Sequence, residues 1–256
     1  MTLTRRTILS LAASAPLGAA SLPEQSAAIA LDRAFPDPNV SYLLTDCATA
    51  CEICSRWTRP MNPLPVGSLV KPFTALAYGQ THGFRYPSFT CSGARCWFLQ
   101  GHGRMEISTA IAHSCNAYFL ELAGDVASES LSSVLQRFGL SAPNAGAEPG
   151  TLIGLGGAWR ISPFAIARAY SELIARSLDP GVRELLAGMA LSGQLGTGRG
   201  VGPGAYVKTG TAGGDGYVIA LFPTDAPRFN LLVRVCGVPG AKAAWVCGKM
   251  RRYVSA

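Results

Sequence analysis

Short stretches made mostly of apolar residues occur near both ends of the chain, and turns rich in Gly, Asp and Pro bound most of these stretches. Such a pattern predicts strands. The predicted strands cover residues 40–46, 52–57, 205–212, 216–222 and 229–236. The first two strands would form a hairpin around "ATA", and the last three would be joined by turns.

Between these strands, the pattern changes to helical spacing. From about residue 68 to 190 the chain is predicted to be largely helical, with glycine-rich loops at 91–103 and 143–158. The final segment, "AKAAWVCGKMRRYV", has the pattern of an amphipathic helix. We therefore expect an α/β (α+β) fold. An antiparallel sheet built from both chain ends would be flanked by helices, with an all-helical lobe inserted between them.

The first twenty residues have a separate pattern. Two arginines precede an apolar run that is too short to span a bilayer and ends in the small residues "GAA". This predicts an export signal that resembles a twin-arginine signal; a general secretory signal and an uncleaved anchor are the alternatives. The expected organisation is a signal at 1–20, a linker at 21–35 and one domain at 36–256. We expect an exported protein, periplasmic or extracellular, with no membrane span beyond the signal.

Composition narrows the class of protein. With 256 residues, of which 48% are hydrophobic, the chain is long enough for a well-buried core. The formal charge of +7 is spread out and contains no basic run, so we expect no nucleic-acid partner. Composition does not predict an oligomeric state.

Eight cysteines fit an exported chain, because thiols pair in an oxidising compartment. Cys91 and Cys96 flank the loop "CSGARC" and are predicted to form a disulfide. Cys47, Cys51 and Cys54 have the spacing of an iron–sulfur motif, but the repeated strand–helix pattern of the corresponding barrel is missing. We therefore expect neither a metal nor a cofactor.

The stretch "PVGSLVKPF" carries the first candidate chemistry. Ser68 and Lys71 lie three residues apart, hence on one face of a helix, where they can share a proton. Pro72 has no N–H and is tolerated only in a first turn, so the helix should begin at or just before Ser68. The chain uses arginine far more often than lysine. Since arginine cannot act as a base, a lysine at position 71 points to proton transfer.

Two further short motifs follow in a fixed order. Ser114-x-Asn116 falls in the helical region and Lys208-Thr209-Gly210 in a predicted strand. Each motif by itself is weak evidence of function, because a motif this short can occur by chance. All three together are expected by chance on the order of a few times in a thousand chains of this composition.

The three motifs resemble those of the penicillin-binding proteins and serine β-lactamases. The likeness extends over most of the domain, through "GHGRMEISTAIAHSCNAYFLELA", "IGLGGAWRISPFAIARAYSELIA" and "MALSGQLGTGRG". The chain is identified as similar to the transpeptidase domain of penicillin-binding proteins. The expected partners are peptidoglycan stem peptides, with β-lactams as covalent inhibitors or substrates.

The resemblance implies catalytic roles for four residues. Ser68 would attack the penultimate carbonyl of a D-alanyl-D-alanine peptide, or a β-lactam ring, and Lys71 would take its proton. Ser114 would pass that proton to the leaving amine, with Lys208 keeping the relay electropositive.

The resemblance also implies substrate contacts. Asn116 would hold the acyl amide, and Thr209 would bind the terminal carboxylate together with Lys208. Gly210, without a side chain, would let a peptide lie along the edge strand. The backbone N–H groups of Ser68 and Thr211 would form the oxyanion hole.

The fate of the acyl-enzyme separates the alternatives. A serine β-lactamase must activate a water, and neither Glu148 nor Trp159 matches the device that such enzymes use for this step. This favours a transpeptidase or D,D-carboxypeptidase, with a β-lactamase as the alternative. A β-lactam-binding sensor module is the alternative from another class; it would need membrane helices.

Overall fold

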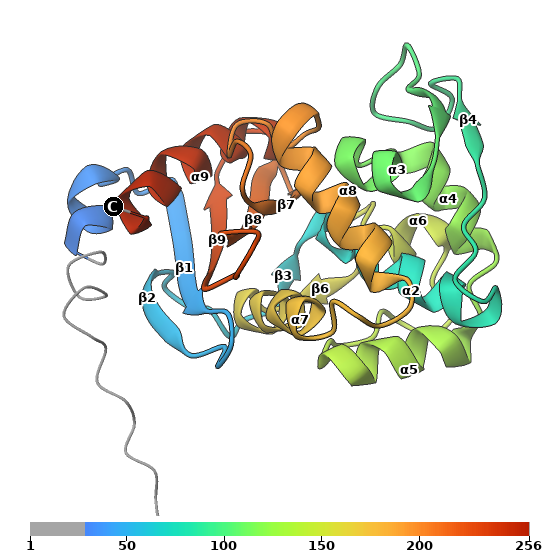
Figure 1. Ribbon diagram of the computed structural model, residues 1–256, viewed down its shortest axis with the longest axis horizontal. Coiled ribbons are helices and arrows are strands. Elements are labelled where there is room, and N and C mark those ends of the chain that lie inside the picture. The colour runs from blue at the N-terminus through green and yellow to red at the C-terminus, as the bar shows by residue number, and fades with distance from the viewer. Residues whose placement is uncertain (1–28, 256) are drawn as a thin grey trace, which may run out of the picture.

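The structure is a computed structural model, and it describes residues 29–255. The predicted export signal, residues 1–20, lies outside this range. The described chain forms a sheet region at one side and a largely helical region at the other (Figure 1).

Five antiparallel strands form the main sheet, in the order β2-β1-β9-β8-β7. Their bounds are Val40–Asp46 (β1), Glu52–Arg56 (β2), Tyr206–Ala212 (β7), Asp215–Phe222 (β8) and Phe229–Val235 (β9). β1 pairs with β9, so the two ends of the chain meet in the centre of one sheet. The predicted sheet is confirmed, and β7, which carries the third motif, is an edge strand.

Both faces of the sheet are buried, which explains why the strands are apolar at most positions. On β8, Val218 and Ala220 belong to one core, whereas Tyr217 and Ile219 belong to the other. Helix α9, Gly240–Val254, covers the first face (Figure 1). The second face packs against α7, α8 and a 3-10 turn, η1, in the helical region.

The inserted region contains one 3-10 turn and seven helices among the described residues. They are η1 (Gly67–Val70), α2 (Lys71–Thr81), α3 (Ile107–His113), α4 (Asn116–Gly124), α5 (Ser128–Phe138), α6 (Pro149–Leu152), α7 (Pro163–Ala175) and α8 (Val182–Leu195).

The inserted region is not all-helical, which corrects one detail of the prediction. Two ribbons of short strands occur in or beside it: β3 (Leu64–Pro65) with β6 (Arg160–Ile161), and β4 (Phe89–Cys91) with β5 (Gly103–Met105). Strands of two or three residues are too short to show an alternating pattern. The β4–β5 hairpin projects from the helical region beside α3 and α4 (Figure 1).

The described part of the predicted linker has regular structure. Residues 29–34 are helical, and Leu31 is fully buried in the core beneath α9. The ring of Phe35 packs edge-on against Tyr253 of α9, with 5.7 Å between centroids.

Among residues 29–255, no helix combines the length and the apolar character that crossing a bilayer requires.

Candidate active site

Ser68 lies in the 3-10 turn η1, directly before α2, as the motif spacing predicts. Gly67 precedes it with a φ of +57°, and a Cβ there would lie 2.5 Å from the carbonyl oxygen of Thr211. Only glycine therefore allows η1 to lie this close to β7. Tyr170 of α7 donates a 2.8 Å hydrogen bond to the carbonyl of Leu69, which anchors the turn that presents Ser68.

Lys71 is fully buried at the start of α2. Its Nζ donates to the carbonyl oxygen of Ser114 at 2.8 Å and to Oδ1 of Asn116 at 2.7 Å. Burial lowers the pKa of Lys71 to about 7, although Cys115 and Cys96 act in the opposite direction. A substantial fraction of this lysine is therefore neutral near pH 7, the form that a general base requires.

Ser114 ends α3 in a left-handed conformation, with a φ of 52°. A residue other than glycine adopts this conformation at a cost of about 1–2 kcal/mol, and such residues gather at functional sites. The turn directs Oγ toward two lysine side chains: Nζ of Lys208 lies 2.8 Å away and Nζ of Lys71 lies 3.4 Å away. The first and third motifs thus meet at the hydroxyl of the second.

Lys208 is also fully buried, on β7. Its Nζ donates to Ser114 Oγ and, at 2.7 Å, to the carbonyl of Thr209. Burial and the positive charge of Lys71 both lower the pKa of Lys208. Protonation of either lysine therefore disfavours protonation of the other.

The remaining motif residues lie around the same point. Thr209 donates a 2.6 Å hydrogen bond to the hydroxyl of Thr197, which donates to the carbonyl of Ala112 at 3.3 Å. Thr197 belongs to the "GTG" stretch and is a site residue that the motif analysis did not assign. Thr211 is exposed, and its Oγ1 accepts a hydrogen bond from the N–H of Gly240.

The absence of a side chain at Gly210 also has a structural reason, which the motif alone did not predict. A Cβ at this position would lie 2.5 Å from the carbonyl oxygen of Val66. The missing side chain therefore makes room for the segment that leads into η1, rather than only for a ligand along the strand.

A cleft of about 420 Å³ contains six of the predicted site residues. It is lined by Ser68, Trp97, Ser114, Asn116, Leu155, Thr197, Thr209, Gly210, Thr211, Pro239 and Ala241. Lys71 and Lys208 lie beneath its floor and reach it through their contacts with Ser114. A groove of about 1020 Å³ between residues 30–37 and α9 contains none of the motif residues, so size alone does not locate the site.

No carboxylate lines this cleft among the described residues. Glu148 is exposed at the start of α6. Trp159 is buried, and its indole N–H donates to the carbonyl of Ser141 at 2.8 Å. Neither residue belongs to the lining of the cleft.

The predicted disulfide is not present in the structure, where Cys91 and Cys96 are free thiols. Both sulfurs face the ring of a histidine instead, and a third cysteine joins them. We call this group the thiol cluster; its members are Cys91, Cys96, His102 and Cys115. Pairing by proximity in sequence failed because the fold brings in two side chains, His102 and Cys115, from outside the six-residue loop. The spacing C-x4-C-x5-H-x12-C was the signal that could have revealed the group.

Trp97 joins the thiol cluster to the cleft. Its ring lies edge-on to His102, with 5.4 Å between centroids, and also lines the cleft. Its indole N–H is shared between the carbonyls of His113 and Ser114, at 3.2 Å each.

Comparison with known proteins agrees with this arrangement. Residues 61–235 match the family model of the penicillin binding protein transpeptidase domain. No relative among curated proteins matches the chain.

Several solved structures share the fold. Penicillin-binding protein 2 of Pseudomonas aeruginosa, in complex with WCK 5153, superposes with a TM-score of 0.76 and 17% identity, over 89% of this chain and 75% of that one. The transpeptidase domain of penicillin-binding protein 3 of Burkholderia pseudomallei superposes with a TM-score of 0.67 and 17% identity, over 90% of this chain and 92% of that one. Penicillin-binding protein 2 of Helicobacter pylori, in complex with MreC, superposes with a TM-score of 0.76 and 16% identity, over 88% of this chain but only 61% of that one.

Proposed function

Since the chain belongs to the family of penicillin-binding protein transpeptidase domains, we propose that it is an active-site serine acyltransferase acting on D-alanyl-D-alanine peptides of peptidoglycan. Its transfer product would be a cross-linked peptide or, with water as acceptor, a trimmed one. Penicillins would acylate the same serine.

One observation carries this proposal: two buried lysines converge on the hydroxyl of Ser114 at the edge of the cleft that Ser68 lines. A neutral lysine amine has two N–H groups and one lone pair. The two shortest contacts of Lys71 Nζ are to acceptor oxygens, at 2.8 and 2.7 Å. In the neutral amine these two contacts would use both N–H groups, and the lone pair would accept the proton of Ser68.

Acylation would combine one bond exchange at the carbonyl carbon with two proton transfers. Ser68 Oγ forms a bond to the carbonyl carbon while its proton passes to Lys71, and the carbon–nitrogen bond of the substrate then breaks. Ser114 gives its hydroxyl proton to the departing nitrogen and regains one from Lys71. Lys208 lies 2.8 Å from Ser114 Oγ, where a positive charge stabilises the transient alkoxide.

The backbone around Ser68 supports an oxyanion hole. A Cβ at Gly67 would lie 2.8 Å from the backbone nitrogen of Thr211, so β7 and η1 bring the amides of Ser68 and Thr211 close together. Two such N–H donors would stabilise the tetrahedral intermediate.

The lining of the cleft favours a peptidase over a β-lactamase. Hydrolysis of a penicilloyl-enzyme requires a base that activates water, and the lining of the cleft offers no carboxylate among the described residues. We therefore expect the penicilloyl-enzyme to be long-lived.

Intact-protein mass spectrometry with benzylpenicillin tests the proposal. We expect one penicilloyl group per chain, mapped to Ser68 and stable over the time of the experiment. Ser68→Ala is the matched control, with circular dichroism to verify its fold, and should remain unmodified.

Two outcomes would change this assignment. An adduct that forms on Ser68 and is rapidly lost, with turnover of the antibiotic, would identify a β-lactamase. Absence of any adduct on a folded protein would refute the acyl-serine function.

A further inference from the structure

The four ligand atoms of the thiol cluster all lie within 4.8 Å of one another. Two of its cysteines are almost completely shielded from solvent, with Cys91 2% and Cys115 0% exposed. Three buried thiols around one imidazole are a set that soft and borderline metal ions bind strongly.

The distances within the cluster match one coordination geometry. With zinc–sulfur bonds of about 2.3 Å and zinc–nitrogen bonds of about 2.05 Å, a tetrahedral site requires about 3.8 Å between two sulfurs and about 3.6 Å between sulfur and nitrogen. The Sγ atoms of Cys96 and Cys115 are 3.8 Å apart. The Nδ1 atom of His102 is 3.6 Å from the Sγ atoms of both Cys91 and Cys96.

We propose that the thiol cluster is a structural zinc site of the Cys3His type. All four positions of the tetrahedron are filled by the protein, which is the arrangement of a structural rather than a catalytic zinc. Each thiol gives its proton to solvent as the metal binds. The site goes beyond the acyltransferase function and does not depend on it.

The surroundings of the sulfurs suit thiolates. Cys96 accepts hydrogen bonds from the backbone N–H groups of Phe98, Asn116 and Ala117. Such donors stabilise a negative sulfur and are common around metal-bound cysteines. Hydrogen bonds within the cluster would leave some of these groups unpaired, because Nδ1 of His102 faces two thiols and can pair with only one at a time. A metal ion would engage all four groups together.

The path of the chain also fits a metal site. Cys91 ends β4 and His102 directly precedes β5, whereas Cys115 is the residue before α4. Gly93 and Gly101 bring the two sides of the loop together, since a Cβ at Gly101 would lie 2.4 Å from the carbonyl oxygen of Cys91. The loop is thus folded tightly around its own ligands.

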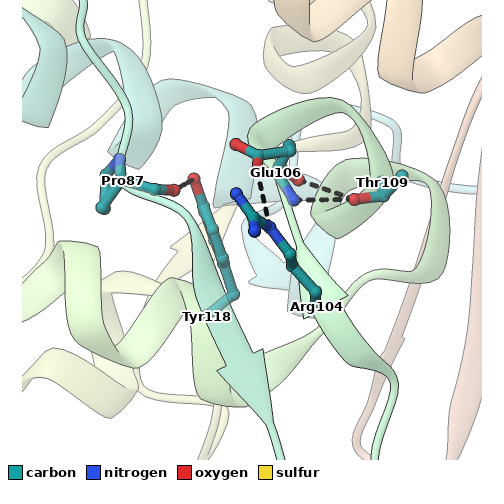
Figure 2. A network of polar contacts seen from close by, with 5 residues as sticks. All are labelled: Pro87, Arg104, Glu106, Thr109 and Tyr118. Carbon is teal, nitrogen blue, oxygen red and sulfur yellow. Dashed lines mark hydrogen bonds and ion pairs between the residues drawn. The ribbon is translucent and has the colours of Figure 1, made fainter.

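The base of the hairpin has a different attachment. Tyr118 donates to the carbonyl of Pro87 at 2.9 Å, and Arg104 forms a 3.5 Å ion pair with Glu106, which begins α3 (Figure 2). Thr109 completes the cap of α3 through two 2.9 Å contacts with the backbone of Glu106 (Figure 2). Zinc would fasten the other end of the hairpin to the α3–α4 junction, at the residue between Ser114 and Asn116.

Metal analysis of the purified full chain tests the proposal. Protein produced with zinc in the medium should contain about one zinc per chain by elemental mass spectrometry. Cys91→Ser and His102→Ala should each lose most of it. Cys51→Ser is the matched control, because Cys51 is an exposed thiol outside the cluster, and it should retain the metal. Removal of zinc by a chelator should lower the melting temperature of the wild type by roughly 10 °C.

Cobalt provides a second readout on the wild type alone, so the test does not depend on variants that fold. After replacement of zinc, Co²⁺ should give thiolate charge-transfer bands and the visible bands of a tetrahedral site. A wild type without zinc and without these bands would overturn the proposal. So would zinc retained equally by the cluster variants, or a Cys91–Cys96 disulfide in non-reducing peptide maps of the protein as purified.

Discussion

The cleft wall and the thiol cluster meet at consecutive residues, Ser114 and Cys115, yet they are opposite in chemistry. On the side of the cleft, two buried lysines are held by neutral oxygen acceptors. On the side of the cluster, three thiols surround an imidazole. The lysines find their hydrogen-bond acceptors within the protein. The sulfurs and the imidazole nitrogen of the thiol cluster would all be engaged at once only when a cation binds between them. One turn of the chain therefore carries both the proposed proton relay and the proposed metal anchor.

The two regions also differ in how they are assembled. The cleft takes its groups from η1, the α3–α4 junction and β7, which are far apart in the sequence. The thiol cluster lies within residues 91–115 and is built from one hairpin and one helix junction. The shared turn therefore belongs both to a local element and to a site assembled from distant ones.

Replacing each lysine at the cleft tests whether Lys71 acts as the base while Lys208 supplies positive charge, and should give the largest effect. Lys71→Arg keeps the charge but cannot lose its proton, so acylation should fall by about 10²–10⁴ or more. Lys208→Arg retains a cation beside Ser114 and should keep measurably more activity. The measurement is the second-order rate of labelling by a fluorescent penicillin, with circular dichroism as the folding control.

Equal losses in the two variants would leave the two lysines without distinct roles. Labelling of Lys71→Arg at the wild-type rate would refute the proposed base.

The pH dependence of acylation tests the same lysine without a mutation. The pKa of Lys71 is lowered to about 7 by burial. Below that pH the amine gains a proton and cannot accept one from Ser68, so the rate should fall by about tenfold per pH unit. Above it, the rate should level off. A stopped-flow profile of penicillin labelling from pH 5.5 to about 8.5 measures this limb; a rate that stays constant across the range would exclude a base with this pKa.

Trp97→Phe tests the link between the two regions and should give the smallest effect. The change keeps an aromatic ring beside His102 but removes the N–H shared by the carbonyls of His113 and Ser114. The loss of such a contact costs about 1 kcal/mol, so acylation should slow by about fivefold. Trp245→Phe is the control, because Trp245 is exposed on α9 and does not line the cleft. Identical labelling rates in both variants would show that the loop does not help to hold the relay.

Much of the fold could be predicted because its signals are local. The five strands of the sheet lie close to the predicted ranges, since burial on both faces makes them continuous apolar runs between turns. The four short strands β3 to β6 could not be predicted, because two or three residues are too few to show an alternation of apolar and polar positions.

The candidate site divides in the same way. Ser68 and Lys71 lie three residues apart, in η1 and at the start of α2, so their spacing by itself predicts that they are close. That Lys208 reaches the hydroxyl of Ser114 follows from the family order of the motifs, not from any spacing between the two residues. Thr197 and Trp97 were not predicted as site residues, because nothing within their own segments places them at the cleft.

By itself, the sequence determined the antiparallel sheet made from both chain ends, a helical turn at Ser68 and the three motifs of an acyl-serine family; the α-helix itself begins at Lys71. These features depend on short-range patterns of apolar residues, a proline and a few polar groups. Tertiary structure decided which cysteines meet. Cys96 lies nearest to Cys91 in sequence, but a left-handed turn at Ser114 brings Cys115 to within 3.8 Å of Cys96. Contacts between distant segments depend on how complete elements pack, and no local pattern records that.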